Sequence, residues 1–355
     1  ANNVSMSEKA PVRKIQMKIF IAVFFLTGRA LLLHAPQLFW QIFYWGRKQQ
    51  IDGRTMNPRA QAYLSFMDVL SPVGMPAVKV FRGGYDKIDR LFGGKRVAVE
   101  QVSPREITIN QCPLKICSYD SKPVDQPKPG LLFFHGGGFV IGSVQSHDGF
   151  CRRLARDTGR RVISVEYRKG PEHKLPSAQL DAIAIWDWLV DNAAVEGVDQ
   201  NDIAVCGDSA GAALTLAVGK HATQLDTQPS ALIPIYPPEA SMAETNSRTL
   251  LLDENVSLTR KVVDWFGEQA CDDSTDFSDP QYALTRKPLP RTYIITCGFD
   301  PLRDEGEEVV RHLRSIGTDV VHEEKPGLFH NYILLGGLFP EVDETTRAIA
   351  KFLPN

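Results

Sequence analysis

The sequence predicts an α/β fold, in which a mostly parallel central sheet is covered by helices on both faces. Two observations carry this prediction. From residue 131 onward, short continuous apolar runs alternate with amphipathic segments. Such runs are typical of strands buried on both faces, and helical crossovers join parallel strands. In addition, a strand, a glycine-flanked turn and a helix of small and aliphatic residues follow one another around Ser209.

The elements of the alternating part are expected at defined positions. The strands are 131–134, 162–165, 203–206, 231–236, 293–296 and 320–323. The helices are 148–158, 177–192, 210–224, 258–268, 302–316 and 341–352. Residues 237–280 are longer and less regular than a simple crossover, so we expect them to contribute to a lid.

Four elements are expected ahead of the alternating part. They are a helix at 59–70 opened by Asn57-Pro58, an amphipathic helix at 77–91, a strand at 97–109 with a break at Pro104, and its hairpin partner at 114–119. Proline lacks the N–H that a sheet ladder needs, which is why the break is expected.

An apolar and aromatic stretch occupies residues 19–45. Its first run, 19–26, is well short of the roughly 20 residues that span a bilayer, and Thr27-Gly28-Arg29 interrupts it. The part from Leu38 to Trp45 has the aromatic density of an interfacial helix. We expect two helices that cover an apolar pocket. The alternatives are peripheral contact with a membrane surface through residues 19–45, or a membrane anchor or cleaved signal.

Composition excludes several classes of protein. The 355 residues are 43% hydrophobic and 23% charged, which describes a folded globular chain. A net charge of −2, without a basic stripe, gives no reason to expect nucleic-acid binding. The six cysteines show neither a C-x-x-C pair nor a Cys/His zinc spacing, so we expect no metal and a reducing compartment, the cytoplasm.

Ser209 lies in the pattern Gly207-Asp208-Ser209-Ala210-Gly211. A nucleophilic serine needs a sharp, strained turn between strand and helix, and Gly207 and Gly211 leave the space for it. The following helix directs its first N–H groups at the same place, where negative charge develops during acyl transfer. Taken alone, such a cluster of small residues is equally common in purely structural turns.

Three further stretches follow predicted strands. His135-Gly136-Gly137-Gly138 supplies backbone N–H groups that can approach a ligand oxygen closely, and its spacing fits neither a dinucleotide nor a phosphate loop. Asp300 precedes Pro301 and a helix, where an N-cap is the simple interpretation. Asp304 is the rival acid, and it and Glu305 are more simply surface acids of a first helical turn. His330 follows the last strand.

The order of these residues decides between the interpretations. Serine, then acid, then histidine, each after a strand, is the chain order of an α/β-hydrolase. Four weak signals in the correct order at one sheet edge make coincidence improbable. The sequence therefore predicts a Ser-His-Asp hydrolase.

The chain resembles the hormone-sensitive-lipase-like (bacterial family IV) esterases. The resemblance covers roughly residue 57 to the carboxyl terminus. It is carried by the glycine-rich stretch after residue 134, by Tyr167-Arg168-Lys169-Gly170-Pro171-Glu172-His173-Lys174, by the Ser209 motif, by Asp300-Pro301-Leu302-Arg303-Asp304 and by His330. Small departures are Lys169-Gly170, Ala212 and Asn331, none of which removes a catalytic group.

The resemblance implies an α/β-hydrolase fold with an N-terminal helical cap at 1–75 and a catalytic domain at 76–355. It implies Ser209 as nucleophile, Asp300 and His330 as its partners, and Gly137, Gly138 and Ala210 as oxyanion-hole donors, without a cofactor. The stretch at Glu172 and His173 is then an architectural turn, and Asp208 holds the serine turn.

The resulting function is a serine carboxylesterase for short- to medium-chain acyl esters. The alternatives are an amide or aryl-acyl deacetylase and a longer-chain lipase with the same triad. A non-catalytic receptor is the third class, and His330 argues against it. The expected partner is a small-molecule acyl ester, a homodimer is left open, and the expected location is cytoplasmic, with membrane association as the alternative.

Overall fold

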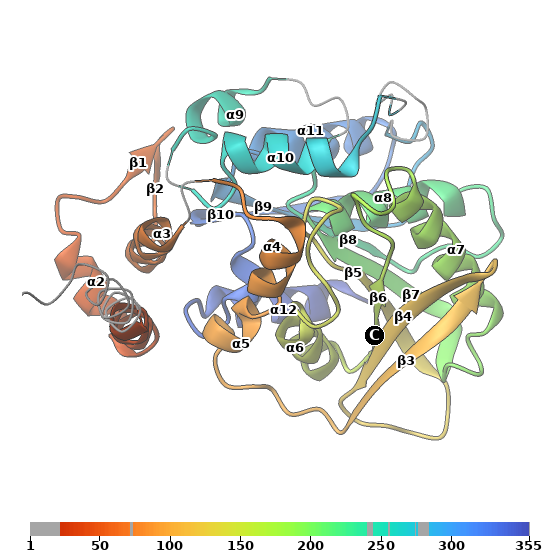
Figure 1. Ribbon diagram of the computed structural model, residues 1–355. Coiled ribbons are helices and arrows are strands. Elements are labelled where there is room, and N and C mark those ends of the chain that lie inside the picture. Colours follow the sequence, from red (N-terminus) through yellow and green to blue (C-terminus); the bar gives the residue numbers. More distant parts are fainter. Residues whose placement is uncertain are drawn as a thin grey trace, which may run out of the picture.

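The computed structural model describes residues 22–71, 74–239, 244–254, 256–273, 275 and 284–354. Within these ranges eight strands form one twisted sheet in the order β10-β9-β8-β7-β5-β6-β4-β3, and six of them run parallel from β6 to β10 (Figure 1). The predicted α/β class is therefore correct.

The alternating part matches the expected positions closely. Its strands are β5 (Lys128–Phe134), β6 (Arg161–Glu166), β7 (Val198–Asp208), β8 (Leu232–Ile235), β9 (Thr292–Phe299) and β10 (Val320–Phe329). Its helices are α6 (Asp148–Thr158), α7 (Ser177–Asp191), α8 (Ala210–Ala222), α10 (Arg260–Ala270), α11 (Arg303–Ser315) and α12 (Glu341–Phe352), with the short α9 (Asn246–Leu251) before α10. Helices α6 and α12 pack together on one side of the sheet, and α7 packs on α8 on the other (Figure 1).

The central strands form the core of the molecule. Every residue of β8 and β9 is buried, as are the last five residues of β5. Burial on both faces explains why these strands appear in the sequence as continuous apolar runs rather than as alternating ones.

The hairpin before β5 differs from the prediction at Pro104. Strand β3 (Gln101–Ile109) begins four residues later than expected and runs through Pro104 without a break, paired with β4 (Cys112–Asp120). Because β3 is the edge strand, proline can be accommodated there without removing a hydrogen bond from the sheet interior.

The helix expected at 77–91 is in fact two. Helix α4 (Val78–Tyr85) ends before Asp86 and α5 (Ile88–Phe92) follows after a turn. Helix α3 (Pro58–Leu70) begins as predicted, since the Asn57 side chain accepts a hydrogen bond from the Arg59 N–H.

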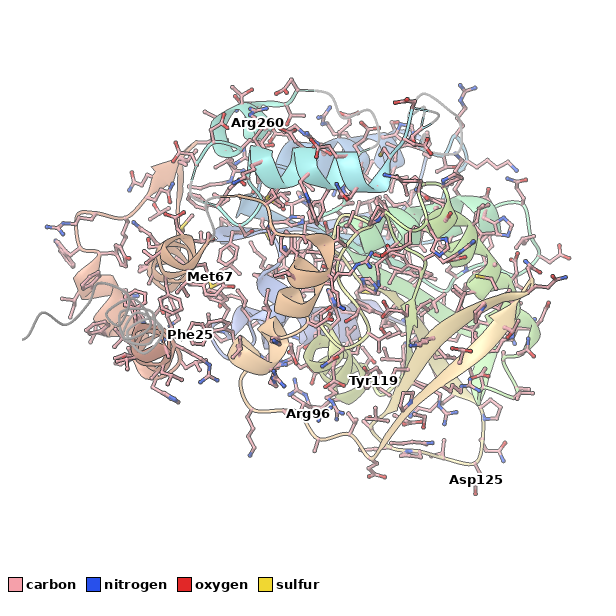
Figure 2. The ribbon with its side chains drawn as sticks, viewed as in Figure 1. Phe25, Met67, Arg96, Tyr119, Asp125 and Arg260 are labelled. Carbon is pink, nitrogen blue, oxygen red and sulfur yellow. The ribbon has the colours of Figure 1, made fainter. Side chains whose placement is uncertain are left out.

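The N-terminal helices lie at one side of the sheet, beside α3 (Figure 1). The first described helix, Ala22–His34, turns by 111° into α2 (Gln37–Phe43). The Phe25 ring of the first helix packs against Phe66 of α3, and Figure 2 labels Phe25 and, on α3, Met67. A small hairpin, β1 (Gln50–Ile51) and β2 (Arg54–Thr55), joins α2 to α3.

No single helix among the described residues is long and apolar enough to cross a membrane. The bent pair of N-terminal helices meets both criteria only when the two helices are counted together. Residues 1–21, including the beginning of the apolar stretch at 19–45, lie outside the described residues, as do 240–243, 255, 274 and 276–280 of the expected lid. All six cysteines are free thiols.

Candidate active site

Ser209 occupies the turn between β7 and α8. Its φ of 53° and ψ of −119° are a strained conformation for a residue with a side chain, as the motif predicts. The Ser209 N–H donates to the Ile235 carbonyl of β8, which holds the turn on the sheet. A Cβ on Gly207 would lie 2.2 Å from the Gly211 oxygen, and one on Gly211 would lie 2.0 Å from the Phe134 oxygen. Only glycine fits at either position, which confirms this part of the prediction.

Three side chains predicted from separate loops form a continuous hydrogen-bonded chain. Ser209 Oγ lies 2.8 Å from His330 Nε2, and His330 Nδ1 lies 2.7 Å from Asp300 Oδ2. Asp300 is fully buried, and its other oxygen accepts a hydrogen bond from the Leu302 N–H at 2.8 Å. The N-cap interpretation is wrong, because α11 begins at Arg303 and its N-cap is Leu302. Asp300 lies in the turn before the helix, where its carboxylate accepts from Leu302 and also holds the imidazole.

Asp304, the rival acid, has different partners. Its carboxylate accepts from the Ser247 N–H at 2.7 Å and lies 3.1 Å from the Arg303 side chain. It therefore anchors α9 to α11. Glu305 is not the surface acid that was expected, because it is 2% exposed and pairs with the buried Arg248 at 2.5 Å. The helix position alone did not reveal that α9 covers it.

The glycine-rich stretch after β5 turns sharply beside Ser209. Gly137 and Gly138 have φ values of 122° and 58°, and a Cβ on Gly138 would overlap the Phe266 ring. The Gly137 carbonyl accepts from the Val140 and Ile141 N–H groups, so it points into its own turn. Gly137, Gly138, Ser209, Ala210 and His330 all line one cavity.

Asp208 ties this stretch to the serine turn. Its carboxylate accepts from the Gly136 N–H at 2.7 Å and from the Tyr236 hydroxyl at 3.2 Å. His147 Nε2 lies 3.1 Å from the same carboxylate, and Asp208 and His147 are both fully buried. The hypothesis that Asp208 has a structural role at the turn agrees with these contacts.

Two residues near His330 were missed by the sequence analysis. The Tyr236 ring packs on the His330 ring with centroids 4.5 Å apart, and the Ser257 hydroxyl donates to the His330 carbonyl at 2.7 Å. Tyr236 directly follows β8, so the rule that active residues follow parallel strands would have found it. Ser257 lies in the irregular lid segment, where no pattern marks it.

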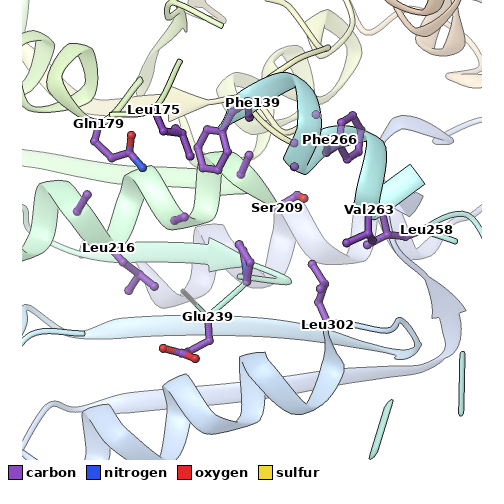
Figure 3. Close-up of a pocket in the computed structure, with 18 of the residues that line it drawn as sticks. Phe139, Leu175, Gln179, Ser209, Leu216, Glu239, Leu258, Val263, Phe266 and Leu302 are labelled. Atoms are coloured by element: carbon purple, nitrogen blue, oxygen red, sulfur yellow. The ribbon is translucent and has the colours of Figure 1, made fainter. Parts of the chain in front are cut away.

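The cavity beside Ser209 has a volume of about 220 Å³ and a mostly apolar wall (Figure 3). The described parts of segment 237–280 supply much of it, including Val263 and Phe266 of α10. No residue of 22–71 lines it. The expectation that the N-terminal helices cover an apolar pocket is therefore wrong for this range, because these helices pack on α3 at the side of the sheet.

The part of the chain that the structure describes holds no cluster of three or more His, Cys, Asp or Glu side chains suited to a metal ion. The stretch at Glu172 and His173 lies outside the cavity wall, and Glu172 pairs with Arg82 of α4 at 2.7 Å. The contact supports the architectural interpretation of that stretch.

Comparison with known proteins gives one consistent result. A family model described as the alpha/beta hydrolase fold matches residues 131–334. An ethyl acetate hydrolase from Pseudomonas putida is 30% identical, with 82% of this chain and 96% of that protein covered. The carboxylic ester hydrolase LipN from Mycobacterium tuberculosis is 32% identical, with 82% and 80% covered.

Solved structures agree with these relatives. The hyperthermophilic esterase from the archaeon Pyrobaculum calidifontis superposes with a TM-score of 0.78 and 31% identity, covering 83% of this chain and 97% of that one. The carboxylesterase EstE1 from a metagenomic library superposes with a TM-score of 0.73 and 28% identity, covering 79% and 99%. The chain belongs to the α/β-hydrolase superfamily and, within it, to the hormone-sensitive-lipase-like carboxylic ester hydrolases.

Proposed function

We propose that the protein is a serine carboxylesterase in which Ser209 is the nucleophile, His330 the general base and acid, and Asp300 the group that orients His330. The observation that carries this assignment is the hydrogen-bonded chain from Ser209 through His330 to Asp300, with Ser209 and His330 on the cavity wall. Gly137, Gly138 and Ala210 are the proposed oxyanion-hole donors, because their backbones line the cavity beside the Ser209 hydroxyl.

In this proposal neutral His330 carries its proton on Nδ1. With Asp300 accepting at Nδ1, the proton sits on Nδ1 and leaves Nε2 free to accept from Ser209. As Ser209 Oγ attacks the ester carbonyl, its proton moves to Nε2, and the carbonyl oxygen becomes an anion that the backbone N–H groups bind. His330 then returns the proton to the departing alcohol, and water releases the acyl group by the same steps.

A short to medium acyl chain is the proposed preference. A cavity of about 220 Å³ with an apolar wall supports it, since it offers dispersion contacts to a modest alkyl group and few polar partners. The names of the relatives include an ethyl acetate hydrolase and acetyl esterases, which agree with short acyl groups. The amide or aryl-acyl deacetylase and the longer-chain lipase stay the alternatives.

The test is a series of p-nitrophenyl esters from acetate to palmitate, run on the wild type and on Ser209→Ala. We expect kcat/KM to peak at short or medium chains and to be lost in the variant. If kcat/KM instead peaks on emulsified long-chain esters, the protein is a lipase. Activity that survives in Ser209→Ala would remove Ser209 as the nucleophile.

We further propose that the N-terminal helices contact an anionic membrane surface. Apolar side chains that are more than half exposed gather on the helix Ala22–His34, on α2 and just after it: Val23, Leu26, Leu38, Ile42, Phe43 and Trp45. The sequence between Glu8 and Asp52 has no acidic residue, and its basic residues are Lys9, Arg13, Lys14, Lys18, Arg29, Arg47 and Lys48. An apolar face within a stretch of sequence whose charged residues are all basic complements anionic lipid headgroups. The six free thiols support placing this contact on the cytoplasmic side.

Sedimentation with vesicles tests this contact. We expect binding to phosphatidylcholine vesicles that contain phosphatidylglycerol, weaker binding at high salt, and a loss of about tenfold in Ile42→Glu. The matched control is Val195→Glu, because Val195 is also an exposed aliphatic residue but precedes β7, away from the N-terminal helices. If Ile42→Glu instead abolishes a concentration-dependent dimer and vesicles do not bind, a second copy of the chain covers the face.

A further inference from the structure

Gln179 of α7 lies in the cavity wall with its amide oxygen unpartnered. The residue is 9% exposed, and Oε1 is buried without a hydrogen-bond partner. Around it the cavity wall is apolar, with Leu175 and Phe139 beside it at one end of the cavity and Ser209 between it and Val263 (Figure 3). A buried carboxamide in apolar surroundings destabilises the fold unless something satisfies it.

The cavity extends from Ser209 toward Gln179 along helix α8. Ala210 lies at the start of this helix beside the nucleophile, and Ala213, Leu216 and Ala217 line the cavity further along. With a rise of 1.5 Å per residue, Ala217 is about 10 Å beyond Ala210 along the helix axis. We name this part of the cavity, bounded by Leu175, Gln179, Ala213, Leu216 and Ala217, the α8 arm.

The residues that bound the α8 arm are apolar except for Gln179, and the next polar side chain of α8 on the cavity wall is Lys220, four residues beyond Leu216. An unbranched hydrocarbon chain that starts at the ester would pack against the small and aliphatic residues of α8. The group that meets Gln179 must then form hydrogen bonds, because an apolar group there would leave the amide unsatisfied. A hydroxyl suits both orientations of the carboxamide, since it donates to oxygen and accepts from nitrogen.

We propose that Gln179 determines specificity for an ester in which one arm is an apolar chain that carries a hydroxyl group about two to three helical turns from the ester carbon. This inference rests on the proposed esterase function, and it narrows the substrate class to hydroxylated chain esters. The buried amide oxygen of Gln179, which has no hydrogen-bond partner beside Leu175 and the apolar residues of α8, is the group that such a hydroxyl would satisfy.

The experiment compares matched substrates on the wild type and Gln179→Met. In one series the acyl chain varies: p-nitrophenyl esters of ω-hydroxy acids and of the alkanoic acids with the same number of heavy atoms, at about eight to twelve carbons. In the other series the alcohol varies: the substrates are acetate esters of α,ω-diols and of the matched alkanols. In one of the two series we expect wild-type kcat/KM to favour the hydroxylated member at one chain length, and Gln179→Met to reduce that ratio at least about fivefold.

Thermal unfolding supplies an independent readout. Gln179→Met is expected to raise the unfolding temperature, because methionine fills the space without a buried polar group. Gln224→Met, at an exposed position after α8, is the matched control and should move neither the ratio nor the unfolding temperature.

Two results would overturn the proposal. In the first, Gln179→Met leaves the ratio of kcat/KM for the hydroxylated and the alkyl substrate unchanged in both series. In the second, the variant unfolds at a lower temperature and loses kcat/KM equally on both members of each pair, which would make Gln179 a structural residue. Failure of the esterase function itself is distinguishable, because p-nitrophenyl acetate would then be hydrolysed no better by the wild type than by Ser209→Ala.

Discussion

Asp300 and Asp304 are four residues apart, yet they have unrelated contacts. Asp300 Oδ2 lies 2.7 Å from His330 Nδ1, whereas Asp304 accepts from the Ser247 N–H. The carboxylate at 300 fixes the imidazole tautomer and stabilises the imidazolium that forms during attack. An asparagine at 300 would favour the wrong tautomer, while an asparagine at 304 could still accept from Ser247.

We therefore expect Asp300→Asn to lower kcat by about 10³- to 10⁴-fold and Asp304→Asn to keep most of the activity. The measurement is kcat on p-nitrophenyl butyrate for both variants, with circular dichroism to confirm folding. The reverse ranking of the two variants would transfer the orienting role to Asp304.

Residue identity and chain order were enough to find Ser209, Asp300 and His330, because each follows a parallel strand. They did not reveal the backbone conformation of Asn331. The φ of Asn331 is 71°, a left-handed conformation that asparagine tolerates better than most residues. A positive φ leaves only a weak signal in a single sequence, so it could not be predicted.

At the scale of elements, helix α4 is joined to the glycine-rich stretch by one side chain. Arg82 donates to the Val140 carbonyl at 2.8 Å and to the Gly170 carbonyl at 2.6 Å, and it pairs with Glu172. Lys169 reaches the Gly142 carbonyl from the same side. The two cations thus hold the turn that carries Gly137 and Gly138.

Arg82→Met is expected to lower kcat about tenfold with little change in KM, because a loosened turn would misplace the oxyanion donors rather than the substrate. Steady-state kinetics on a short-chain ester would measure it. Glu172→Gln is the matched variant: it weakens the exposed ion pair but leaves both carbonyl contacts, and it should cost less than about threefold. Equal losses of kcat in the two variants would show that the ion pair, and not the two carbonyl contacts, positions the turn.

Element positions were predicted well where burial on both faces gives a continuous apolar run, as in β5 and β9. They were predicted poorly where the outcome depends on neighbours. Pro104 continues a strand only because that strand lies at the edge of the sheet, and the turn at Asp86 splits a segment whose amphipathic pattern is continuous. Sheet order is a long-range property that no local pattern contains.

At the scale of the whole molecule, stability is expected to depend on Asp89. Burial, together with the nearby Asp148 carboxylate, raises the pKa of Asp89 to about 6, and Arg153 and His147 oppose this rise only in part. A raised pKa means that the folded state binds the proton more tightly than the unfolded state does. The contribution of protonated Asp89 to the free energy of unfolding is fully present below about pH 4 and is lost as the pH rises through 6.

Asp89→Asn cannot lose that proton, so its stability relative to the wild type should increase between pH 5 and pH 8. A pKa change from 3.8 to about 6 corresponds to about 3 kcal/mol. Only about half of this change falls between pH 5 and pH 8, and partial access of water reduces it further, so the expected gain over that range is about 1 kcal/mol. Urea unfolding of both proteins at the two pH values measures it, and a difference that does not change with pH would contradict the prediction.

The hairpin between α2 and α3 reaches the far end of the chain. Asp52 accepts from Arg303 at 2.6 Å, Arg54 pairs with Glu324, and the Asn57 N–H donates to the Gly327 carbonyl, three residues before His330. Partners separated by some 250 residues cannot meet until the later of the two has been synthesised. During translation this hairpin therefore emerges long before its partners, so its ion pairs form late. The loop that carries His330 acquires this contact late, so we expect the active geometry to form only after β10 has been synthesised.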